Sequence, residues 1–385
     1  MKKLTVGLAV ALPLFAAAAI PAAATTIEVG PKIEIRDGSV KAPSDAKAAR
    51  PYIVTLSEDA DPLGVTNLLG VSATQVFDNA LLGFAARLTE DQVALLRGLP
   101  SVLAIERDHR VRTAEVDWGL DRLDQRSLPL DGRYSALGDG AGVTAYLIDS
   151  GIDPSVADLQ GRARNVFDAL GDDGRDCNGH GTHVAGIVGG AEYGVAKATK
   201  LRGLRVLDCN GEGWTSDVIA ALDWIAGNAR KPAVANLSLS GPRSKALNNT
   251  ARQVVRSGVY LTVAAGNNSK NACTESPAST RNVLTVAATD QYDYAADFSN
   301  YGRCVDLYAP GDAITSDWVG GGTQVMSGTS MAAPHAVGAA ALYKSTWGDA
   351  SAAEITEWIL SSATEDTVVD NPAGTPDRLL NVDSM

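Results

Sequence analysis

The sequence predicts an α/β fold with a mostly parallel central sheet and helices on both of its faces, preceded by a small α+β unit. Helical segments at 215–229 and 244–258 alternate with nearly continuous apolar runs that end in small or polar residues. Such runs are typical of strands that are buried on both faces of a parallel sheet. There are five of them, at residues 143–151, 201–207, 233–240, 259–266 and 283–289. With 385 residues, 45% of them hydrophobic, the chain is long enough for a sizeable core.

The first 49 residues are predicted to lie outside both folded units. A basic start is followed by an apolar run at 4–20 and by small residues up to Ala24. This pattern is typical of a secretory signal at 1–24, cut after Ala24, and residues 25–49 are interpreted as a linker. A membrane anchor is the alternative interpretation, although the run is short and rich in alanine. The net charge of −12 argues against a nucleic-acid partner.

Residues 50–112 are predicted to form the small unit, and residues 113–385 the main domain. Strands are expected at 52–56, at 101–113 and, on either side of a turn at Asp78-Asn79, within 73–88. The segment 62–70 has a weak helical pattern. A better helix is expected at 89–100, because Thr89 and Gln92 match a capping box. About 60 residues are few for a domain that must be stable by itself.

Polar residues follow two of the predicted strands in the main domain. Asp149 ends a buried strand and has no explanation in the local sequence, whereas Asp153 precedes a proline and is interpreted as a helix N-cap. Asn267 follows the strand at 259–266. Its amide can donate to a developing oxyanion, although Asn also favours turns. Ligands of parallel sheets bind beyond the carboxyl ends of the strands, which is where Asp149 and Asn267 are expected.

Two of the four histidines lie at the start of a predicted helix. His180 stands between glycines, and His183 would share its helix face, so a metal pair is conceivable. The spacing is not that of HExxH, and we interpret His183 as a hydrogen-bonded structural residue. Cys177 and His180 have zinc-ligand spacing, but no second pair completes such a site. His109, in a basic run of the small unit, is expected to be solvated.

The segment at 325–338 contains two serines, a proline and a histidine. Because proline is tolerated only in the first turn of a helix, Pro334 predicts a helix that begins close to Ser330, which favours Ser330 over Ser327. Ser330 would then lie among unpaired N–H groups at the positive end of the helix dipole, a good place for a nucleophile. His335 would lie about 140° round the helix from Ser330, so a packing role is expected for it.

Three of these motifs closely resemble the active-site motifs of the subtilases. They are "LIDSGID" with Asp149, "NGHGTHVAG" with His180 and "SGTSMAAPH" with Ser330, in the order found in that family. Segments 118–131, 277–290 and 297–311 look closer to the proteinase K branch and its aqualysin-like members. The resemblance covers residues 115 to 383, and the small unit is similar to the subtilase propeptide. It implies a three-layer subtilisin-like domain and a secreted serine endopeptidase that matures by autoproteolysis.

The resemblance also implies a role for each residue. Ser330 would attack the scissile carbonyl, His180 would act as its base, and Asp149 would orient His180 and stabilise the imidazolium. Asn267 and the backbone N–H of Ser330 would form the oxyanion hole. The peptide or protein substrate would be clamped as an added strand, with broad selectivity and an apolar or aromatic residue before the scissile bond. The clamping stretches would be Gly211-Glu212-Gly213 and Ser238-Leu239-Ser240.

Disulfides and structural calcium are implied as well. An even number of cysteines in an exported chain favours disulfides, and four cysteines allow three pairings. The aqualysin-like pattern pairs Cys177 with Cys209 and Cys273 with Cys304. One implied calcium site would use Asp306 and the carbonyls of Arg281 and Val283, and a second would use Asp121, Asp124, Gln125 and Asp131. Solvated surface acids are the alternative for these residues. Catalysis itself would need no cofactor.

The small unit is implied to assist folding and then to inhibit the enzyme, with cleavage near residues 110–114. We expect an extracellular monomer that does not associate with membranes once the signal is removed. Two rival hypotheses differ in class. One is a metallohydrolase built on His180, His183 and Cys177, and the other is an inactive binding protein of the same fold. The four intact catalytic positions argue against the second.

Overall fold

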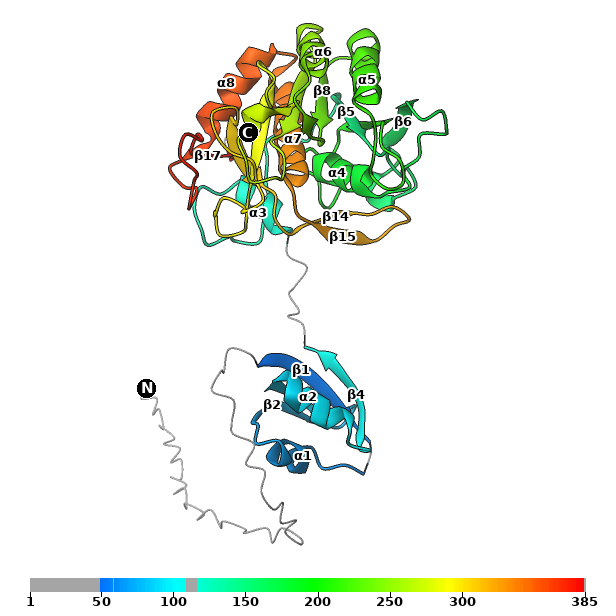
Figure 1. Ribbon diagram of the computed structural model, residues 1–385, viewed down its shortest axis with the longest axis vertical. Coiled ribbons are helices and arrows are strands. Elements are labelled where there is room, and N and C mark those ends of the chain that lie inside the picture. The colour runs from blue at the N-terminus through cyan, green and yellow to red at the C-terminus, as the bar shows by residue number, and fades with distance from the viewer. Residues whose placement is uncertain (1–48, 58, 109–115, 384–385) are drawn as a thin grey trace, which may run out of the picture. The chain divides into compact units, whose positions relative to one another are not determined.

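The computed structural model describes residues 49–57, 59–108 and 116–383, which form two compact units (Figure 1). The predicted signal, the linker up to residue 48, His109 and the expected cleavage region at 110–114 lie outside the described residues. None of the described helices has the length and apolarity needed to span a bilayer.

The small unit is a four-stranded antiparallel sheet with two helices, as the sequence predicts. The strand order is β2-β3-β1-β4. The capping box of α2 is present, because Thr89 N–H donates to Gln92 Oε1 at 2.9 Å and Gln92 N–H donates to Thr89 Oγ1 at 3.3 Å. Its core contains Val54, Phe84 and Leu96. The elements are β1 (Arg50–Leu56), α1 (Pro62–Leu68), β2 (Ala73–Asp78), β3 (Leu82–Leu88), α2 (Glu90–Arg97) and β4 (Val102–Arg107).

The main unit is built on a nine-stranded sheet in the order β6-β7-β5-β8-β10-β12-β13-β17-β16. Every neighbouring pair is parallel except β16–β17, so the predicted mostly parallel sheet is confirmed. All five apolar runs form strands of this sheet. The strands are β5 (Thr144–Asp149), β6 (Ala163–Asp168), β7 (Lys200–Arg205), β8 (Ala233–Leu237), β10 (Tyr260–Ala264), β12 (Leu284–Thr289), β13 (Leu307–Pro310), β16 (Thr364–Glu365) and β17 (Arg378–Leu379).

Helices cover both faces of this sheet, and successive residues of a strand point into different cores. In β5, Leu147 packs into the core shared with α4 (His180–Gly189), α7 (Thr329–Trp347) and α8 (Ala352–Ser362). The next residue, Ile148, packs against α5 (Thr215–Asn228) and α6 (Lys245–Arg256) (Figure 1). This burial on both sides explains why the strands are apolar throughout. The remaining elements are α3 (Trp118–Leu123), η2 (Ala157–Leu159), η3 (Ala272–Thr274) and the short pairs β9–β11 (Gly241–Pro242 with Glu275–Ser276) and β14–β15 (Ile314–Asp317 with Thr323–Met326).

The start of α7 agrees with the prediction, but the reason given for it was wrong. The helix begins at Thr329, directly before Ser330, whereas Pro334 lies inside the helix rather than in its first turn. Proline has no N–H to donate to the carbonyl four residues earlier, which here belongs to Ser330. The hydroxyl of Ser238 donates to this carbonyl at 2.8 Å instead. The helix thus tolerates Pro334 because a neighbouring loop supplies the missing donor.

Asp153 was also misinterpreted. No α-helix follows it, and its carboxylate instead accepts the backbone N–H of Ser155 at 3.0 Å within a turn. Its second oxygen accepts the backbone N–H of Gly320 at 2.9 Å. Asp153 therefore joins two loops that are far apart in the sequence, a contact that the Asp-Pro pattern does not reveal.

Candidate active site

Three strand ends that carry candidate residues lie at the same edge of the sheet. Asp149 is the last residue of β5, Ser238 directly follows β8, and Asn267 lies shortly after β10. Because neighbouring parallel strands end at the same edge, these residues are brought together there. Helices α4 and α7, which begin at His180 and next to Ser330, pack against one another below this edge.

Asp149 and His180 form a hydrogen-bonded pair. His180 Nδ1 lies 2.7 Å from Asp149 Oδ1, which also accepts the backbone N–H of Ser150 at 2.8 Å. Asp149 is completely buried, and its Oδ2 has no hydrogen-bond partner among the described residues. A buried carboxylate in this position holds the imidazole so that Nε2 is presented to the solvent side.

The residues on either side of His180 must be glycines, because neither position has room for a side chain. Gly179 has a φ of 109°, and a Cβ on it would lie 2.4 Å from the ring of Trp318. A Cβ on Gly181 would lie 2.0 Å from the carbonyl oxygen of Gly151. The Gly-His-Gly pattern therefore lets the start of α4 approach the end of β5 closely enough for the contact with Asp149.

Two opposing effects set the pKa of His180. Burial of the imidazole disfavours its charged form, whereas the charge and hydrogen bond of Asp149 and the charge of Asp176 favour it. The carboxylates prevail, so the pKa of His180 is raised above its ordinary value of 6.5. A raised pKa makes the imidazole a stronger base, which suits the abstraction of a proton from a hydroxyl.

Asp176 is a supporting residue that the sequence analysis did not identify. Its Oδ1 accepts the hydroxyl of Ser150 at 2.9 Å and the backbone N–H of Gly179 at 2.8 Å. Its Oδ2 accepts the backbone N–H of Thr182 at 2.9 Å and the hydroxyl of Thr182 at 2.6 Å. Asp176 thereby fixes the loop that leads into α4 and sets the position of His180. The only local signal is an acidic residue just before a glycine-rich helix start.

Asn267 and Ser330 present two donors to one small space. The amide of Asn267 is oriented by its Oδ1, which accepts the backbone N–H of Thr329 at 2.9 Å and its hydroxyl at 2.8 Å. This leaves Nδ2 free to point outward. A Cβ placed on Gly328 would lie 3.2 Å from Asn267 Nδ2 and 3.6 Å from the backbone nitrogen of Ser330. Both nitrogens therefore border the side of Gly328 that carries no side chain, and donors so placed could serve a developing oxyanion.

The hydroxyl of Ser330 donates to the carbonyl of Ser238 at 3.1 Å rather than to His180. The same Ser238 is held in place by Asn236, whose amide donates to its hydroxyl at 2.8 Å. Catalytic hydrogen bonds are often loose before substrate binds, and rotation about the Cα–Cβ bond of a serine redirects its hydroxyl. Asn236, which is fully buried, was not identified from the sequence.

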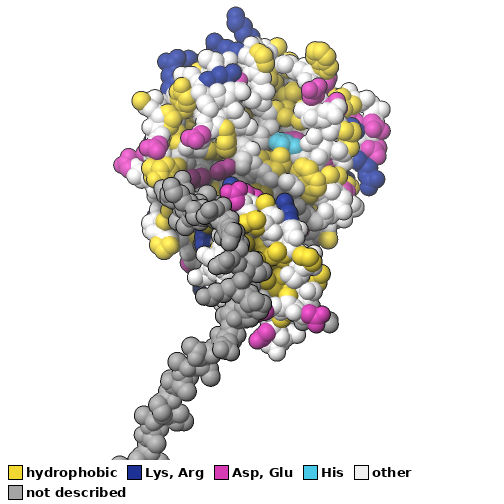
Figure 2. All heavy atoms as spheres, turned by 60° about the horizontal axis from the view of Figure 1, so that its bottom comes forward, with side chains coloured by type: hydrophobic (Ala, Val, Ile, Leu, Met, Phe, Trp, Pro, Cys, Tyr) yellow, Lys and Arg dark blue, Asp and Glu magenta, His cyan; other side chains and the backbone are white. Residues whose placement is uncertain are grey.

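A groove of about 880 Å³ leads away from His180. Both predicted clamping stretches line it, namely Gly211-Glu212-Gly213 on one side and Ser238-Leu239-Ser240 on the other. Figure 2 shows a histidine side chain at the surface of the molecule, among hydrophobic and uncharged side chains. Of the three described histidines, only His180 is not buried. The geometry is that of an open cleft beside an activated imidazole.

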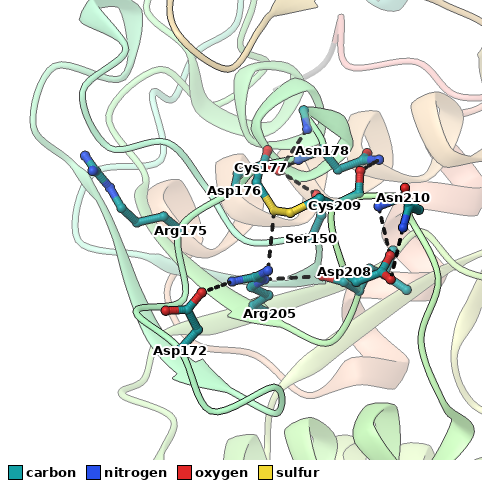
Figure 3. The surroundings of a disulfide bond; sticks show 12 residues. Ser150, Asp172, Arg175, Asp176, Cys177, Asn178, Arg205, Asp208, Cys209 and Asn210 are labelled. Atoms are coloured by element: carbon teal, nitrogen blue, oxygen red, sulfur yellow. Dashed lines mark hydrogen bonds and ion pairs between the residues drawn. A yellow bond between two sulfur atoms is a disulfide. The ribbon is translucent and has the colours of Figure 1, made fainter.

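The cysteines form the two pairs that the resemblance implies, Cys177–Cys209 and Cys273–Cys304. Because Cys177 is oxidised, it is not a metal ligand, which removes the zinc alternative and the metallohydrolase hypothesis. Figure 3 shows that the first disulfide joins the loop before His180 to the loop before Gly211. The amide of Asn178 reinforces this link by donating to the carbonyl of Cys209 at 3.2 Å.

The other candidate side chains have structural roles. His183 is buried, and its Nε2 lies 2.9 Å from the carbonyl of Gln324, as expected for a hydrogen-bonded structural residue. His335 is buried with Nδ1 2.9 Å from the carbonyl of Met331, which agrees with the packing role. Burial lowers the pKa of each of these two histidines to about 4. The hydroxyl of Ser327 accepts the backbone N–H of Ala313 at 2.9 Å.

The implied calcium ligands Asp121, Asp124, Gln125 and Asp131 lie at the end of α3 and in the loop that follows it. The amide of Gln125 contacts the carboxylates of Asp121 and Asp131, and Asp124 Oδ2 accepts the backbone N–H of Ser135 at 2.7 Å. Asp124 Oδ1 is buried without a partner among the described residues, as expected of a carboxylate meant for a cation. Burial raises the pKa values of Asp121 and Asp124. Carboxylate and amide oxygens are ligands of the kind that calcium prefers in proteins.

The other implied set centres on Asp306, whose Oδ2 accepts the backbone N–H of Thr285 at 2.8 Å. Burial raises the pKa of Asp306 to about 6. Val283 is buried two residues before Thr285, and Arg281 is exposed. Among the residues that the structure describes, no group of three or more His, Cys, Asp or Glu side chains is arranged to hold a metal ion.

Comparison with known proteins identifies relatives of both units. The profile of the subtilase family (Peptidase S8) matches residues 140–376, and that of peptidase inhibitor I9 matches residues 51–114. An extracellular serine proteinase of Thermus sp. (strain Rt41A) is 47% identical over 329 residues, which cover 83% of this chain and 80% of that protein. Alkaline serine exoprotease A of Vibrio alginolyticus is 44% identical over 328 residues, covering 82% of this chain and 61% of that protein. The crystal structure of a cold-adapted subtilisin-like serine proteinase is similar with a TM-score of 0.68 at 46% identity, covering 70% of this chain and 99% of that one.

Proposed function

Because this chain belongs to the subtilase family of serine endopeptidases, we propose that Ser330, His180 and Asp149 form its catalytic triad. The observation that carries the proposal is the 2.7 Å contact between Asp149 and His180 at the sheet edge where α7 presents Ser330. His180 removes the proton of the Ser330 hydroxyl as its oxygen attacks the scissile carbonyl, and then gives this proton to the leaving amine. Asp149 keeps the imidazole oriented and stabilises its charged form. A water molecule then hydrolyses the acyl-enzyme by the same steps.

Asn267 Nδ2 and the backbone N–H of Ser330 form the oxyanion hole in this proposal. The supporting observation is that both donors border the space beside Gly328. Their orientation is fixed before substrate arrives, because Thr329 holds the other end of the Asn267 amide. Donors that need no reorganisation stabilise the tetrahedral intermediate more than the planar substrate, which lowers the barrier.

The substrate is a peptide bound between the stretches 211–213 and 238–240. Backbone groups of the two stretches hydrogen-bond to an extended peptide, so affinity depends little on its side chains. The lining of the groove is mainly apolar or uncharged and contains Leu239, Leu207 and Met326. This composition supports an apolar or aromatic residue before the scissile bond.

The N-terminal part of the chain governs maturation. The I9 domain, which we place at residues 50–112, inhibits the catalytic domain of residues 113–385 until autoproteolysis near 110–114 separates them. The relative from Thermus is named an extracellular proteinase, and residues 1–24 of this chain have the pattern of a secretory signal, followed by a linker at 25–49. We therefore place the mature enzyme outside the cell as a monomer.

Calcium stabilises the main domain in this proposal and takes no part in the chemistry. Asp121, Asp124, Gln125 and Asp131 would hold one ion, supported by the buried oxygen of Asp124 that has no partner in the described part of the chain. A hard cation prefers such oxygen ligands, and its charge would offset the cost of burying the carboxylates. Asp306 with the carbonyls of Arg281 and Val283 would hold a second ion.

The decisive experiment compares the precursor with its Ser330→Ala variant. In a host without interfering proteases, the parent chain is expected to yield a shorter mature form and to hydrolyse casein, whereas Ser330→Ala stays at precursor length and is inactive. Ser327→Ala is the matched control, because Ser327 lies in the same segment and its hydroxyl accepts the backbone N–H of Ala313. Mass spectrometry locates the cleaved bond. Full maturation and activity of Ser330→Ala would show that Ser330 is not the nucleophile.

A further inference from the structure

One wall of the groove carries two exposed side chains that the triad does not use. Trp214 is 78% exposed although it is a large aromatic residue, and Glu212 is exposed two residues before it. Both line the groove that leads from His180. The carboxylate of Glu212 has no hydrogen bond or ion pair with any residue that the structure describes. These two side chains could contact a substrate directly, whereas the rest of this wall is proposed to bind it through backbone groups.

The two exposed side chains flank Gly213. Trp214 has extended dihedral angles, with φ −98° and ψ 147°. In an extended stretch, neighbouring residues point to opposite sides and residues two apart to the same side. A Cβ on the intervening Gly213 would lie 2.1 Å from the carbonyl oxygen of Val206, so the side of Gly213 faces the protein. Glu212 and Trp214, on either side of Gly213, both line the groove.

The loop that presents Glu212 is held firmly. The carboxylate of Asp208 accepts the backbone N–H groups of Asn210 at 2.8 Å and Glu212 at 3.0 Å, and Asp208 N–H donates to the carbonyl of Glu212 at 2.8 Å. The disulfide of Cys209 ties the same loop to Cys177, as Figure 3 shows. A fixed backbone reduces the entropy lost when the Glu212 carboxylate pairs with a ligand.

The charge around this wall is negative. Asp208 and Glu212 both line the groove, and no Lys or Arg is present among the described residues that line it. The backbone hydrogen bonds lower the pKa of Asp208, so its carboxylate stays charged in mildly acidic solution. A positively charged side chain of the substrate would thus meet a carboxylate and the face of an indole with no competing cation on the wall.

We propose that Glu212 and Trp214 form a cation-selective subsite, so that the enzyme prefers peptides with Lys or Arg in the segment held between the two clamping stretches. This inference rests on the proposed function, since it assumes that the groove binds the substrate. The carboxylate pairs with the ammonium or guanidinium group, and the indole face stacks on it. The subsite adds a charge preference to an enzyme whose other contacts are with the peptide backbone.

The expected preference is modest because both side chains are exposed. A cation on an exposed aromatic face improves binding about two- to five-fold, and an exposed ion pair about 1.4- to five-fold. Together they predict that kcat/KM for a peptide with Lys or Arg exceeds that of a neutral peptide by about three- to twenty-fold. Raising the ionic strength from about 0.01 M to about 1 M should remove most of the part due to Glu212.

The test uses mature enzyme and fluorogenic peptides that share one scissile bond. Each peptide carries Lys, Arg or one of the neutral isosteres norleucine and Gln at one position. That position is in turn each of the three that precede the residue whose carbonyl belongs to the scissile bond. The measured quantity is the ratio of kcat/KM for the charged and neutral peptides. At the position that meets the subsite, Glu212→Gln and Trp214→Leu are each expected to lower this ratio, and the double variant to bring it near one. Trp214→Leu keeps the backbone N–H that donates to Asp217.

Glu357→Gln is the matched control. Glu357 is an exposed glutamate on α8 that does not line the groove, so its substitution removes the same charge and leaves the groove unchanged. Its ratio should equal that of the parent enzyme. The proposal is overturned if no position favours Lys or Arg, if Glu212→Gln keeps the ratio, or if Glu357→Gln lowers it equally. In each of these cases hydrolysis of the neutral peptides still depends on Ser330. Failure of the proposed function would instead appear as hydrolysis by Ser330→Ala.

Discussion

Asp317 offers a stability prediction with a defined sign. It ends β14, is only 2% exposed, and faces a second carboxyl group, that of Asp158. The Oδ2 atoms of both have no hydrogen-bond partner among the described residues. Burial raises the pKa of Asp317 to about 7, helped by the charges of Asp158 and Glu192, against the charge of Arg162. The Arg162 guanidinium is engaged elsewhere, since it donates to the carbonyl of Thr199 at 3.0 Å.

The sign of the pH dependence follows from proton binding. The pKa of Asp317 rises from 3.8 to about 7 on folding, so the folded state keeps a proton that the unfolded state has released between these pH values. The free energy of unfolding therefore falls as pH rises from about 4 to about 7, and stays at the lower value above that. A difference of about 3 pH units corresponds to at most about 4 kcal/mol, and we expect about 2–4 kcal/mol.

Asp317→Asn removes this titration and leaves the size of the side chain nearly unchanged. The variant is expected to be more stable than the parent by about 2–4 kcal/mol near pH 8.5 and nearly equal to it near pH 4. Urea unfolding at both pH values is measured on mature enzyme inactivated with a phosphonylating reagent, which prevents self-digestion. Asp223→Asn is the control, because Asp223 is exposed on α5. A variant that is destabilised near pH 8.5, or that shifts equally at both pH values, would refute the reasoning.

Three further predictions concern the site. Asp149→Asn is expected to lower kcat by about 10⁴-fold. Because the charge that raises the pKa of His180 is lost, the acid limb of the pH profile of kcat/KM should also move to lower pH, and an unmoved limb would contradict the assigned pair. Asn267→Ala is expected to lower kcat by about 10²- to 10³-fold with little change in KM, and a change confined to KM would count against the oxyanion role. Chelation of calcium is expected to lower the Tm of the parent enzyme more than that of Asp124→Asn, as measured by calorimetry, whereas equal shifts would exclude Asp124 as a ligand.

Much of the fold is predictable from the sequence because its causes are local or periodic. A strand buried on both faces must be apolar at every position, and all five such runs became strands of one sheet. The capping box at Thr89 and Gln92 needs only residues three apart, and it is present. The same local reasoning failed at Pro334, because a hydroxyl from another loop replaces the hydrogen bond that proline cannot make.

The candidate site was found through motifs, but its supporting residues were not. Asp149, His180, Asn267 and Ser330 stand in motifs whose residue types point to their chemistry. Supporting residues such as Asp176 act through several ordinary hydrogen bonds, and the sequence does not show which partners the folded chain provides. No spacing rule separates such an acid from a solvated one.

The sequence by itself determined the α/β class, the strands and the residue types available for catalysis. Only the tertiary structure decided which groups meet. The contact of Asp149 with His180 spans 31 residues, and the disulfides span 32 and 31. Asp158 and Asp317 meet from segments still further apart. The reason is physical: such contacts depend on which strands become neighbours and where the parallel strands end, and that order is set by the packing of the whole sheet.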